Sequence, residues 1–386
     1  MKVLFWMSTS FQTTSRHLLI DIILKLVEHG NTVCILQKKM PTEEEALPVE
    51  LQGQNISCIF VPVKASRKQD LINRFITDIK YVAKCAKFVD DSYDAVFIQS
   101  SNVAGLQARI INRKAPKTIM TFNVQDMFPQ NAHLSGTIKG PAYLLLRKSH
   151  DYVYSRSNHI IAISDDIRNY LIELGVESKK IEVVYNWSYQ DEPIIRLPLT
   201  TSITKMFDPS RFNVVYAGNI GRMQNVEILI KAAAILKYED QIWFQVIGDG
   251  VYKAKVEELS RNLGLKNISF WSMQDSSHAY EIYSNADINI IPLARNIYKT
   301  ALPSKTASCL ACNRPIIFCI GKDSLFGMKT KDNTGCPLVE SDDPDELAKM
   351  ILDIKMGSIK CDTESFFKAH FSRTINSAEY ARIITQ

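Results

Sequence analysis

The feature of this sequence that most restricts its fold is a regular alternation of short apolar runs with segments of helical periodicity. The runs KVLFWMS, TVCILQ, SCIFVPV, AVFIQS, KTIMTF and HIIAIS are typical of buried strands. Between them apolar residues recur at helical spacing, as Leu18, Ile22 and Leu26 do ahead of Gly30. Strands that alternate with helices predict βαβ units and a mainly parallel sheet.

A stretch around residues 187–211 interrupts this alternation. It is rich in Pro, Ser and Thr, and we interpret it as a linker between domains. The alternation restarts with FNVVYAGN and continues through WFQVIGDG, ISFWSM, INIIPL and RPIIFCI. Because 386 residues exceed what one ordinary core accommodates, the sequence predicts an α/β protein with two doubly wound halves. Such sheets bind ligands beyond the carboxyl ends of their strands, so functional residues are expected directly after strands.

Composition excludes several classes of protein. The formal net charge of +5 is too small to indicate a nucleic-acid binder, and no apolar run is long enough to span a membrane. The start, MKVLFWMSTS, is expected to be a buried strand and not a signal peptide. Eight scattered cysteines are expected to be small core residues in a reducing compartment, and the pair Cys309 and Cys312 to serve helix packing, because no second pair stands at metal spacing.

Two turns that follow strands in the second half contain glycines. The first turn contains Gly218, Asn219, Gly221, Arg222 and Gln224, and the second contains Gly248, Asp249 and Gly250. Glycine lets a backbone approach a ligand closely, and an arginine at a helix start suits a phosphate group. Ordinary turns are the alternative reading, and the parallel placement of the two segments is what favours a ligand site.

The segment LPSKTASCLAC places Pro303, Ser304 and Lys305 at a predicted helix start. Proline suits the first helical turn, and a serine can cap it. A lysine there is unfavourable for the helix dipole unless an anion is bound, so Lys305 indicates a phosphate group. A lysine that points to solvent is the alternative.

The first half offers one carboxylate of interest. Asp126 follows the fifth strand-like run, among aromatic residues, and is a candidate general base or ligand for sugar hydroxyls. A cap or turn role is the alternative for Asp126. Ser164 is expected to cap a helix. The first strand is followed by STSFQTTSRH without a glycine, which weighs against a dinucleotide fingerprint and a hydride-transfer enzyme.

Taken in order, six segments resemble the retaining glycosyltransferases of family 4, over nearly the whole chain. They are NVQDMFP, IIAISDDIRNYLIELGVESKKIEVVYNW, VVYAGNIGRMQNVEILIKAA, VIGDG, NADINIIPL and LPSKTASCLACNRPII. More narrowly, they resemble the bacterial branch with O-antigen and capsule N-acetyl-L-fucosamine transferases. The resemblance implies the GT-B fold, in which two Rossmann-like domains face a central cleft. Residues 1–196 would bind the acceptor and 197–365 the nucleotide-sugar donor, and a C-terminal helix within 366–386 would pack back on the first domain.

The resemblance also implies which residues hold the donor. The family holds the diphosphate with an Arg and a Lys after the first donor-domain strand, and Asn219 and Gln224 stand at those positions here. Arg222 and Lys305 are therefore the expected phosphate ligands, together with the glycines of both turns, Asp249, Pro303 and Ser304.

Two glutamates of the family pattern are absent. Thr300 and Ser308 stand at their positions, and the second of these is the ribose position of the family. A hydroxyl does not reproduce the bidentate hold of a carboxylate on two ribose hydroxyls. Donor binding is therefore expected to be weakened, or the chain to be catalytically degenerate.

The resemblance implies transfer of a sugar from a nucleotide-diphosphate sugar, with UDP as the expected nucleotide, to a glycan or polyprenyl-diphosphate-linked acceptor. Asp126, Arg222 and Lys305 are the expected catalytic residues, the anomeric configuration is retained, and neither a metal ion nor another cofactor is expected. The resemblance also implies a location in the bacterial cytoplasm and a role in the synthesis of surface polysaccharides. A non-enzymatic partner subunit of another transferase and a nucleotide-sugar 2-epimerase are the alternatives.

The charge of the chain is unevenly spread. From Lys64 to Lys117 eleven Lys and Arg residues face five Asp residues, a local charge of +6. A surface that lies against anionic lipid at the inner face of the plasma membrane is one interpretation, and a solvated helix face is the other.

Overall fold

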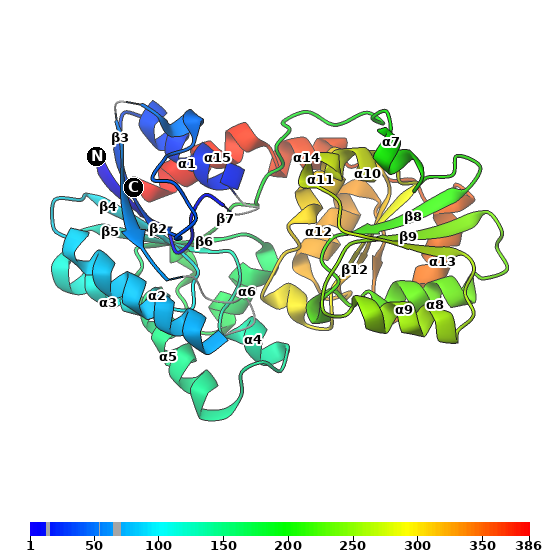
Figure 1. Cartoon of the computed structure of the whole chain (residues 1–386), viewed down its shortest axis with the longest axis horizontal. Coiled ribbons are helices and arrows are strands. Elements are labelled where there is room, and N and C mark those ends of the chain that lie inside the picture. The colour runs from blue at the N-terminus through cyan, green and yellow to red at the C-terminus, as the bar shows by residue number, and fades with distance from the viewer. Residues whose placement is uncertain (13–15, 54, 65–70) are drawn as a thin grey trace. The chain divides into compact units, whose positions relative to one another are not determined.

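The computed structural model describes residues 1–12, 16–53, 55–64 and 71–386 (Figure 1). The chain forms two compact units, which we call unit 1 (residues 1–185 and 373–386) and unit 2 (residues 186–372). Each unit has a parallel sheet with helices on both faces. The predicted α/β architecture with two doubly wound halves is confirmed.

The sheet of unit 1 has, within the described residues, seven parallel strands in the order β3-β2-β1-β4-β5-β6-β7. They are β1 (Lys2–Trp6), β2 (Thr32–Lys39), β3 (Ile56–Pro62), β4 (Ala95–Gln99), β5 (Ile119–Val124), β6 (His159–Ala162) and β7 (Ile181–Val183). The middle strands are buried on both sides, as in β4, where Ala95, Val96, Phe97 and Ile98 have no exposed surface. This explains why they read as continuous apolar runs.

The helices of unit 1 cover both faces of this sheet. They are α1 (Arg16–Glu28), α2 (Leu71–Cys85), α3 (Ala104–Lys114), α4 (Gln130–Leu134), α5 (Gly140–Arg156), α6 (Asp165–Glu173) and α15 (Arg373–Ile384). Figure 1 shows α1 and α15 on one face and α2, α3 and α5 on the other. In α6 the backbone N–H of Ile167 donates to Ser164 Oγ at 3.2 Å, so the predicted serine cap is confirmed.

The helix α15 completes unit 1 although it comes from the far end of the chain. The Arg373 guanidinium donates to both carboxylate oxygens of Asp21 on α1, at 2.8 and 2.6 Å, and Asp21 is only 5% exposed. Further along α15, the Tyr380 hydroxyl accepts a hydrogen bond from Asn123 on β5 at 2.8 Å. A paired, nearly buried carboxylate fixes the register of α15 on α1 more sharply than apolar contact alone.

Unit 2 repeats the design with six parallel strands among its described residues, in the order β10-β9-β8-β11-β12-β13. They are β8 (Phe212–Ala217), β9 (Ile242–Ile247), β10 (Ile268–Trp271), β11 (Ile288–Pro292), β12 (Ile316–Cys319) and β13 (Leu338–Val339). Its helices are α7 (Thr201–Thr204), α8 (Glu227–Ile235), α9 (Lys253–Asn262), α10 (Ala279–Asn285), α11 (Lys305–Ala311), α12 (Leu325–Thr334), α13 (Pro344–Lys355) and α14 (Glu364–His370).

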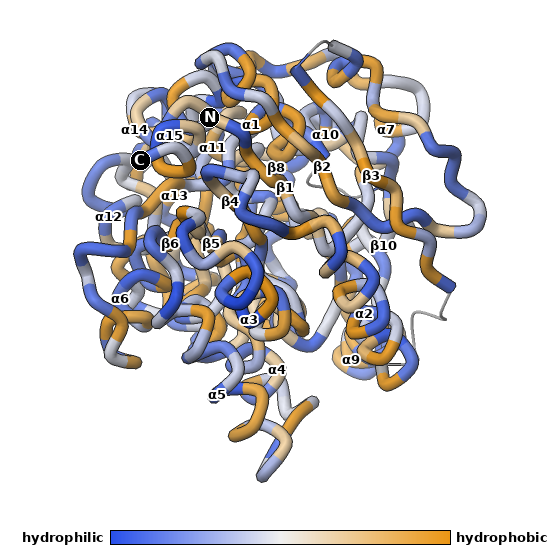
Figure 2. Tube along the Cα trace, turned by 90° about the vertical axis from the view of Figure 1, so that its left-hand side faces the viewer, coloured by the Kyte–Doolittle hydropathy of each residue, from blue (hydrophilic) through white to orange (hydrophobic). Residues whose placement is uncertain are grey.

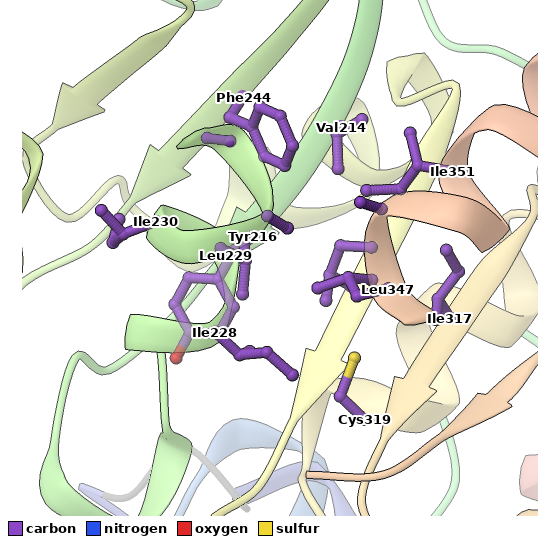
Figure 3. Packing of buried hydrophobic residues seen from close by; sticks show 14 of the residues in the cluster. Val214, Tyr216, Ile228, Leu229, Ile230, Phe244, Ile317, Cys319, Leu347 and Ile351 are labelled. Atoms are coloured by element: carbon purple, nitrogen blue, oxygen red, sulfur yellow. The ribbon is translucent and has the colours of Figure 1, made fainter. Parts of the chain in front are cut away.

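A buried apolar cluster holds α8 and α13 on the sheet of unit 2 (Figure 3). Val214 and Phe244 from the strands meet Leu229 of α8 and Leu347 of α13, and all four are fully buried. Tyr216 belongs to the same cluster, but its ring reaches the carboxyl end of β8, where the site described below begins.

The stretch predicted to be a linker is instead packed on unit 2. Trp187 and Ser188 are each 2% exposed, and Ile203 of α7 is fully buried. The backbone N–H of Ile194 also donates to the Ala311 carbonyl at 2.6 Å. Pro, Ser and Thr here mark an irregular but packed segment, which composition alone cannot distinguish from a free linker.

Two further expectations can be compared with the structure. Among the described residues no helix is long and apolar enough to span a membrane. All eight cysteines are free thiols, and six of them, including Cys309 and Cys312, are buried. Helix packing as the role of this pair is consistent with that burial.

Candidate functional site

The strand order of unit 2 reverses at β8. Strands β9 and β10 lie to one side of it, and β11, β12 and β13 lie to the other. Doubly wound sheets bind ligands in the crevice at such a reversal, beyond the carboxyl ends of the strands. The turn after β8 and the segment that leads from β11 into α11 meet there, and they contain most of the predicted residues.

The two glycine turns pack on each other through their backbones. The N–H of Ile220 donates to the Asp249 carbonyl at 2.8 Å. A Cβ atom on Gly248 would lie 1.9 Å from the Gly218 carbonyl oxygen, and one on Gly250 would lie 2.3 Å from that of Ile220. Contact between the turns therefore requires glycine at 248 and 250, whereas the sequence suggested an approach of ligand to backbone.

Gly218 makes room for a lysine. A Cβ atom on Gly218 would lie 2.8 Å from Lys305 Nζ, and the residue has a φ of +140°, which favours glycine. Lys305 as a whole is half-buried, but its Nζ is buried and has no hydrogen-bond partner in the part of the chain that the structure describes. The alternative in which Lys305 points to solvent is therefore wrong.

The Tyr216 ring and the Cys309 thiol lie near Lys305 Nζ. Nζ lies 3.7 Å from the centroid of the Tyr216 ring, and a cation–π contact of this kind contributes about 0.5–2 kcal/mol. Burial lowers the pKa of Lys305 to about 7, while the nearby Cys309 thiol acts weakly in the opposite direction. A buried amine without an acceptor is unfavourable unless an anionic group completes its surroundings, so the geometry fits an anion.

Arg222 follows β8 in a short 3-10 helix over Arg222–Gln224. Its side chain is exposed, and its Nε donates to the Tyr252 hydroxyl at 3.0 Å. Since α8 begins only at Glu227, the prediction that Arg222 stands at a helix start is wrong. A tyrosine from α9's leading turn, and not a helix dipole, orients the guanidinium.

Asn219 and Gln224 support the turn. The side-chain amide of Asn219 donates to Gln224 Oε1 at 3.1 Å, and the Tyr216 hydroxyl donates to the Asn219 carbonyl. A Cβ on Gly221 would lie 2.7 Å from both side chains of that amide pair. These contacts shape the turn, while the exposed side of Asn219 remains available to a ligand.

Asp249 is exposed at the edge of the site. Its carboxylate lies 3.5 Å from Lys253 Nζ on α9. The ion pair offsets a negative charge that would otherwise oppose an anion here, although such surface pairs contribute about 0–1 kcal/mol.

The residues around α11 divide into exposed and buried ones. Ser304 occupies the N-cap position without a side-chain cap hydrogen bond, so its predicted capping is wrong, and Pro303 precedes the helix by two residues. Ser308 is half-buried in α11. Thr300 is fully buried and its hydroxyl donates to the Ile297 carbonyl at 3.1 Å, so it presents no polar group to a ligand in this structure.

Asp126 belongs to unit 1. It follows β5, and the N–H groups of Gln125 and Asp126 donate to Ser100 Oγ, which follows β4, at 3.1 and 3.3 Å. Asp126 is an exposed residue, yet desolvation by the surrounding protein raises the pKa of its carboxyl to about 6. A carboxyl of this kind can accept a proton near neutral pH.

Two tyrosines of the site, Tyr216 and Tyr252, are not among the residues that the sequence motifs predict. Tyr216 belongs to the apolar run of a strand, and Tyr252 lies outside the two glycine turns. Their common signal is an aromatic residue within two positions of a glycine turn: Tyr216 precedes Gly218 and Tyr252 follows Gly250. Over the described ranges, no group of three or more His, Cys, Asp or Glu side chains is placed to hold a metal ion.

Two family models match the chain. The model described as "Glycosyl transferase 4-like domain" matches residues 21–187, and the model described as "Glycosyl transferases group 1" matches residues 211–355. The first falls in unit 1 and the second in unit 2, apart from a few residues at the boundary.

Curated relatives share a moderate identity with the chain. It is 23% identical to WbjE of Pseudomonas aeruginosa, a protein named as a probable glycosyltransferase. The match extends over 279 residues, which are 68% of this chain and 66% of that protein. The chain is 28% identical over 158 residues to WcaI of Escherichia coli K12, whose name refers to colanic acid biosynthesis, with 40% and 38% covered. The chain thus spans less than two thirds of the length of these relatives.

Solved structures match over nearly the full length. HepE of Anabaena, solved in complex with UDP, has a TM-score of 0.69 at 16% identity, with 99% of both chains covered. A sucrose-phosphate synthase of Thermosynechococcus elongatus has a TM-score of 0.70 at 13% identity, with 100% of this chain and 95% of that chain covered. At these identities the likeness shows a shared fold.

Proposed function

The chain belongs to the family 4 glycosyltransferases and has the GT-B fold, and from this premise we propose that it transfers a sugar from a nucleotide-diphosphate sugar to a glycan or lipid-linked glycan. The observation that carries the proposal is the buried, unpartnered Nζ of Lys305 behind Gly218, at the strand reversal of unit 2. An amine in this position is completed by the negative charge of a diphosphate.

Sugar transfer from a diphosphate requires stabilisation of the charge on the leaving group more than covalent catalysis by the protein. When the sugar leaves the diphosphate, negative charge grows on the leaving oxygens, and fixed positive groups lower the barrier most when they need no reorganisation. Lys305 is held in place by burial and Arg222 by Tyr252. We assign both to the leaving diphosphate, with retention of the anomeric configuration and without a metal ion or other cofactor.

Asp126 receives the acceptor-side role in this proposal. Its carboxyl, whose pKa desolvation raises to about 6, is suited to bind or deprotonate a sugar hydroxyl. For the donor we propose a UDP-sugar of the hexosyl type, since HepE is solved with UDP and with UDP-glucose. For the setting we propose bacterial surface polysaccharide synthesis, in line with the names of the relatives.

One observation favours a second candidate, a catalytically degenerate partner of another transferase. The Thr300 hydroxyl is already bonded within the protein, and Ser308 offers only one hydroxyl where the family has a carboxylate. Such a protein would bind a nucleotide weakly and transfer nothing.

Calorimetry with UDP, GDP, dTDP and ADP, followed by a transfer assay with the matching nucleotide sugars and lipid-linked acceptors, separates the candidates. Nucleotide binding with transfer supports the proposal. Binding without transfer supports the degenerate partner, and acceptor-independent conversion of the nucleotide sugar supports the 2-epimerase. If none of the four nucleotides binds at millimolar concentration, the donor site is wrongly assigned.

For its location we propose the cytoplasmic face of an anionic membrane. Residues 65–70 of the basic stretch Lys64–Lys117 lie outside the described residues, but α2 and the segment after it contribute Arg74, Lys80, Lys84 and Lys87. Each basic group near an anionic surface contributes about 1 kcal/mol, which salt screens. Co-sedimentation with anionic liposomes should therefore weaken as salt rises, and binding that is absent at low salt would support the solvated face.

A further inference from the structure

An exposed apolar surface lies where α4 meets α5 in unit 1. We call Leu134, Leu144 and Leu145 the apolar ridge; their exposed fractions are 44%, 57% and 71%. The His133 and Tyr143 rings stack at a centroid distance of 4.2 Å, which ties α4 to the first turns of α5. The ridge is therefore built by two elements that hold each other.

The ridge lies on the side of α5 that the sheet does not use. The buried residues of α5 are His150, Val153 and Tyr154, in its second half, where the helix packs on α3 and β5. The first half extends beyond that contact, and Figure 2 shows hydrophobic stretches where the α4–α5 segment projects from the rest of unit 1. Leucines exposed side by side on a helix mark a contact with a membrane or another protein.

Charge identifies which of these partners fits. From Leu134 to His150 the sequence contains no acidic residue, but it contains Lys139, Arg147 and Lys148. The first acidic side chain is that of Asp151, whose carboxylate lies 3.9 Å from the Arg147 guanidinium. Leucines in a stretch whose charged residues up to His150 are all basic are complementary to a bilayer with anionic head groups, where apolar side chains enter the acyl boundary and cations remain at the phosphates.

We propose that the apolar ridge inserts into the head-group region of an anionic bilayer, with Lys139, Arg147 and Lys148 on the lipid phosphates. This inference rests on the proposed work at a membrane surface and names an element for it outside the basic stretch Lys64–Lys117. The two contributions differ physically, since burial of leucine is insensitive to salt while attraction by lysine is screened.

The test uses the full-length protein and vesicles of phosphatidylcholine with one quarter phosphatidylglycerol. The double variant Leu144→Glu/Leu145→Glu should bind at least tenfold more weakly than the wild type, which corresponds to about 1.4 kcal/mol. The loss should persist in 0.5 M salt. Ile375→Glu is the matched control, because Ile375 is 56% exposed on α15, a helix of the opposite face of the same sheet.

Three results would overturn the inference. One is equal vesicle binding by the double variant and the control, and another is equal binding to vesicles of pure phosphatidylcholine. The third is a change in oligomeric state of the double variant without vesicles, which would make the ridge a contact between copies. Two measurements on the same samples keep the outcomes separate. Hydrogen exchange in the strands of unit 1 shows whether the double variant is folded there, and a wild type that binds vesicles but no nucleotide contradicts the donor site alone.

Discussion

Units 1 and 2 share one strand topology but differ in the turn after the first strand and in the pairing of a nearby lysine. In each sheet the first strand lies inside, with the next two strands on one side and the later ones on the other. In unit 2 the first strand runs into glycine turns that close on a buried, unpartnered lysine. In unit 1 the first strand runs into MSTSFQ without glycine, and the lysine of the neighbouring strand, Lys38, is paired with Asp78 at 2.5 Å.

The difference shows that strand order alone fixes where a ligand can bind and not whether one does. Loops and the state of their charged groups decide that, as is general for folds that serve many functions. A paired lysine contributes to stability and needs nothing more. An unpaired buried lysine is unfavourable for the free protein and is explained by a ligand.

The largest effect is expected from removing each of these lysines. Lys305→Met should weaken binding of the nucleotide sugar or its turnover roughly 30- to 1000-fold, by analogy with loss of one electrostatic donor, worth about 2–4 kcal/mol. The same change should raise the thermal midpoint of the free protein, because it removes a buried amine.

Lys38→Met is the matched variant in unit 1. It leaves Asp78 without its cation and should lower the thermal midpoint while nucleotide binding, measured by calorimetry, stays as in the wild type. The contrast fails if both variants change binding and stability in the same direction.

The next effect concerns the glycine turns. Gly248→Ala should destabilise the protein by about 1–3 kcal/mol through overpacking and should reduce nucleotide affinity, because its Cβ would overlap the Gly218 carbonyl. Gly53→Ala in unit 1 is the control, since among the described residues no atom beyond its chain neighbours lies within 4 Å of its added Cβ. Chemical denaturation and calorimetry measure both effects, and a Gly248→Ala protein with native stability would contradict the packing described here.

Some of the features that these variants test can be predicted from the sequence, and others cannot. The parallel sheets, the position of the glycine turns and the Ser164 cap follow from periodicity and residue type, which act locally. The burial of Lys305 Nζ and of Thr300 does not, because it depends on how β8, α11 and the turn before α11 pack together. For the same reason the segment after Trp187 looked like a linker: its composition is that of a loop, and only its contacts with Ala311 and the core show that it is packed.

A smaller effect is expected in unit 1. Arg373→Met leaves the nearly buried carboxylate of Asp21 without its guanidinium and should cost about 1–2 kcal/mol, since part of the Arg373 side chain is exposed. Nucleotide affinity should not change. Hydrogen exchange should rise in α15 and α1, and an equal rise throughout unit 2 would mean that the two units do not unfold separately.

The last effect is that of pH on donor affinity. UDP-glucose keeps the same charge from pH 6 to 8, so over this range its affinity reports on the protein. Because burial holds the pKa of free Lys305 near 7, affinity should be constant below pH 7 and should fall by up to about tenfold per pH unit above it. The Lys305→Arg variant, which stays charged, should show a flat profile, and a matching slope in both proteins would exclude Lys305 as the cause.

The most direct test of the account is the titration of Lys305 itself. The Cε and Nζ resonances of labelled lysine can be followed by NMR from pH 5 to 11, with Lys305→Arg for assignment. The account predicts a midpoint near 7 in the free protein and a clear rise when UDP-glucose is bound, because the diphosphate stabilises the ammonium form. A midpoint near the ordinary lysine value of about 10.4 in the free protein, or one that bound nucleotide does not move, would contradict it.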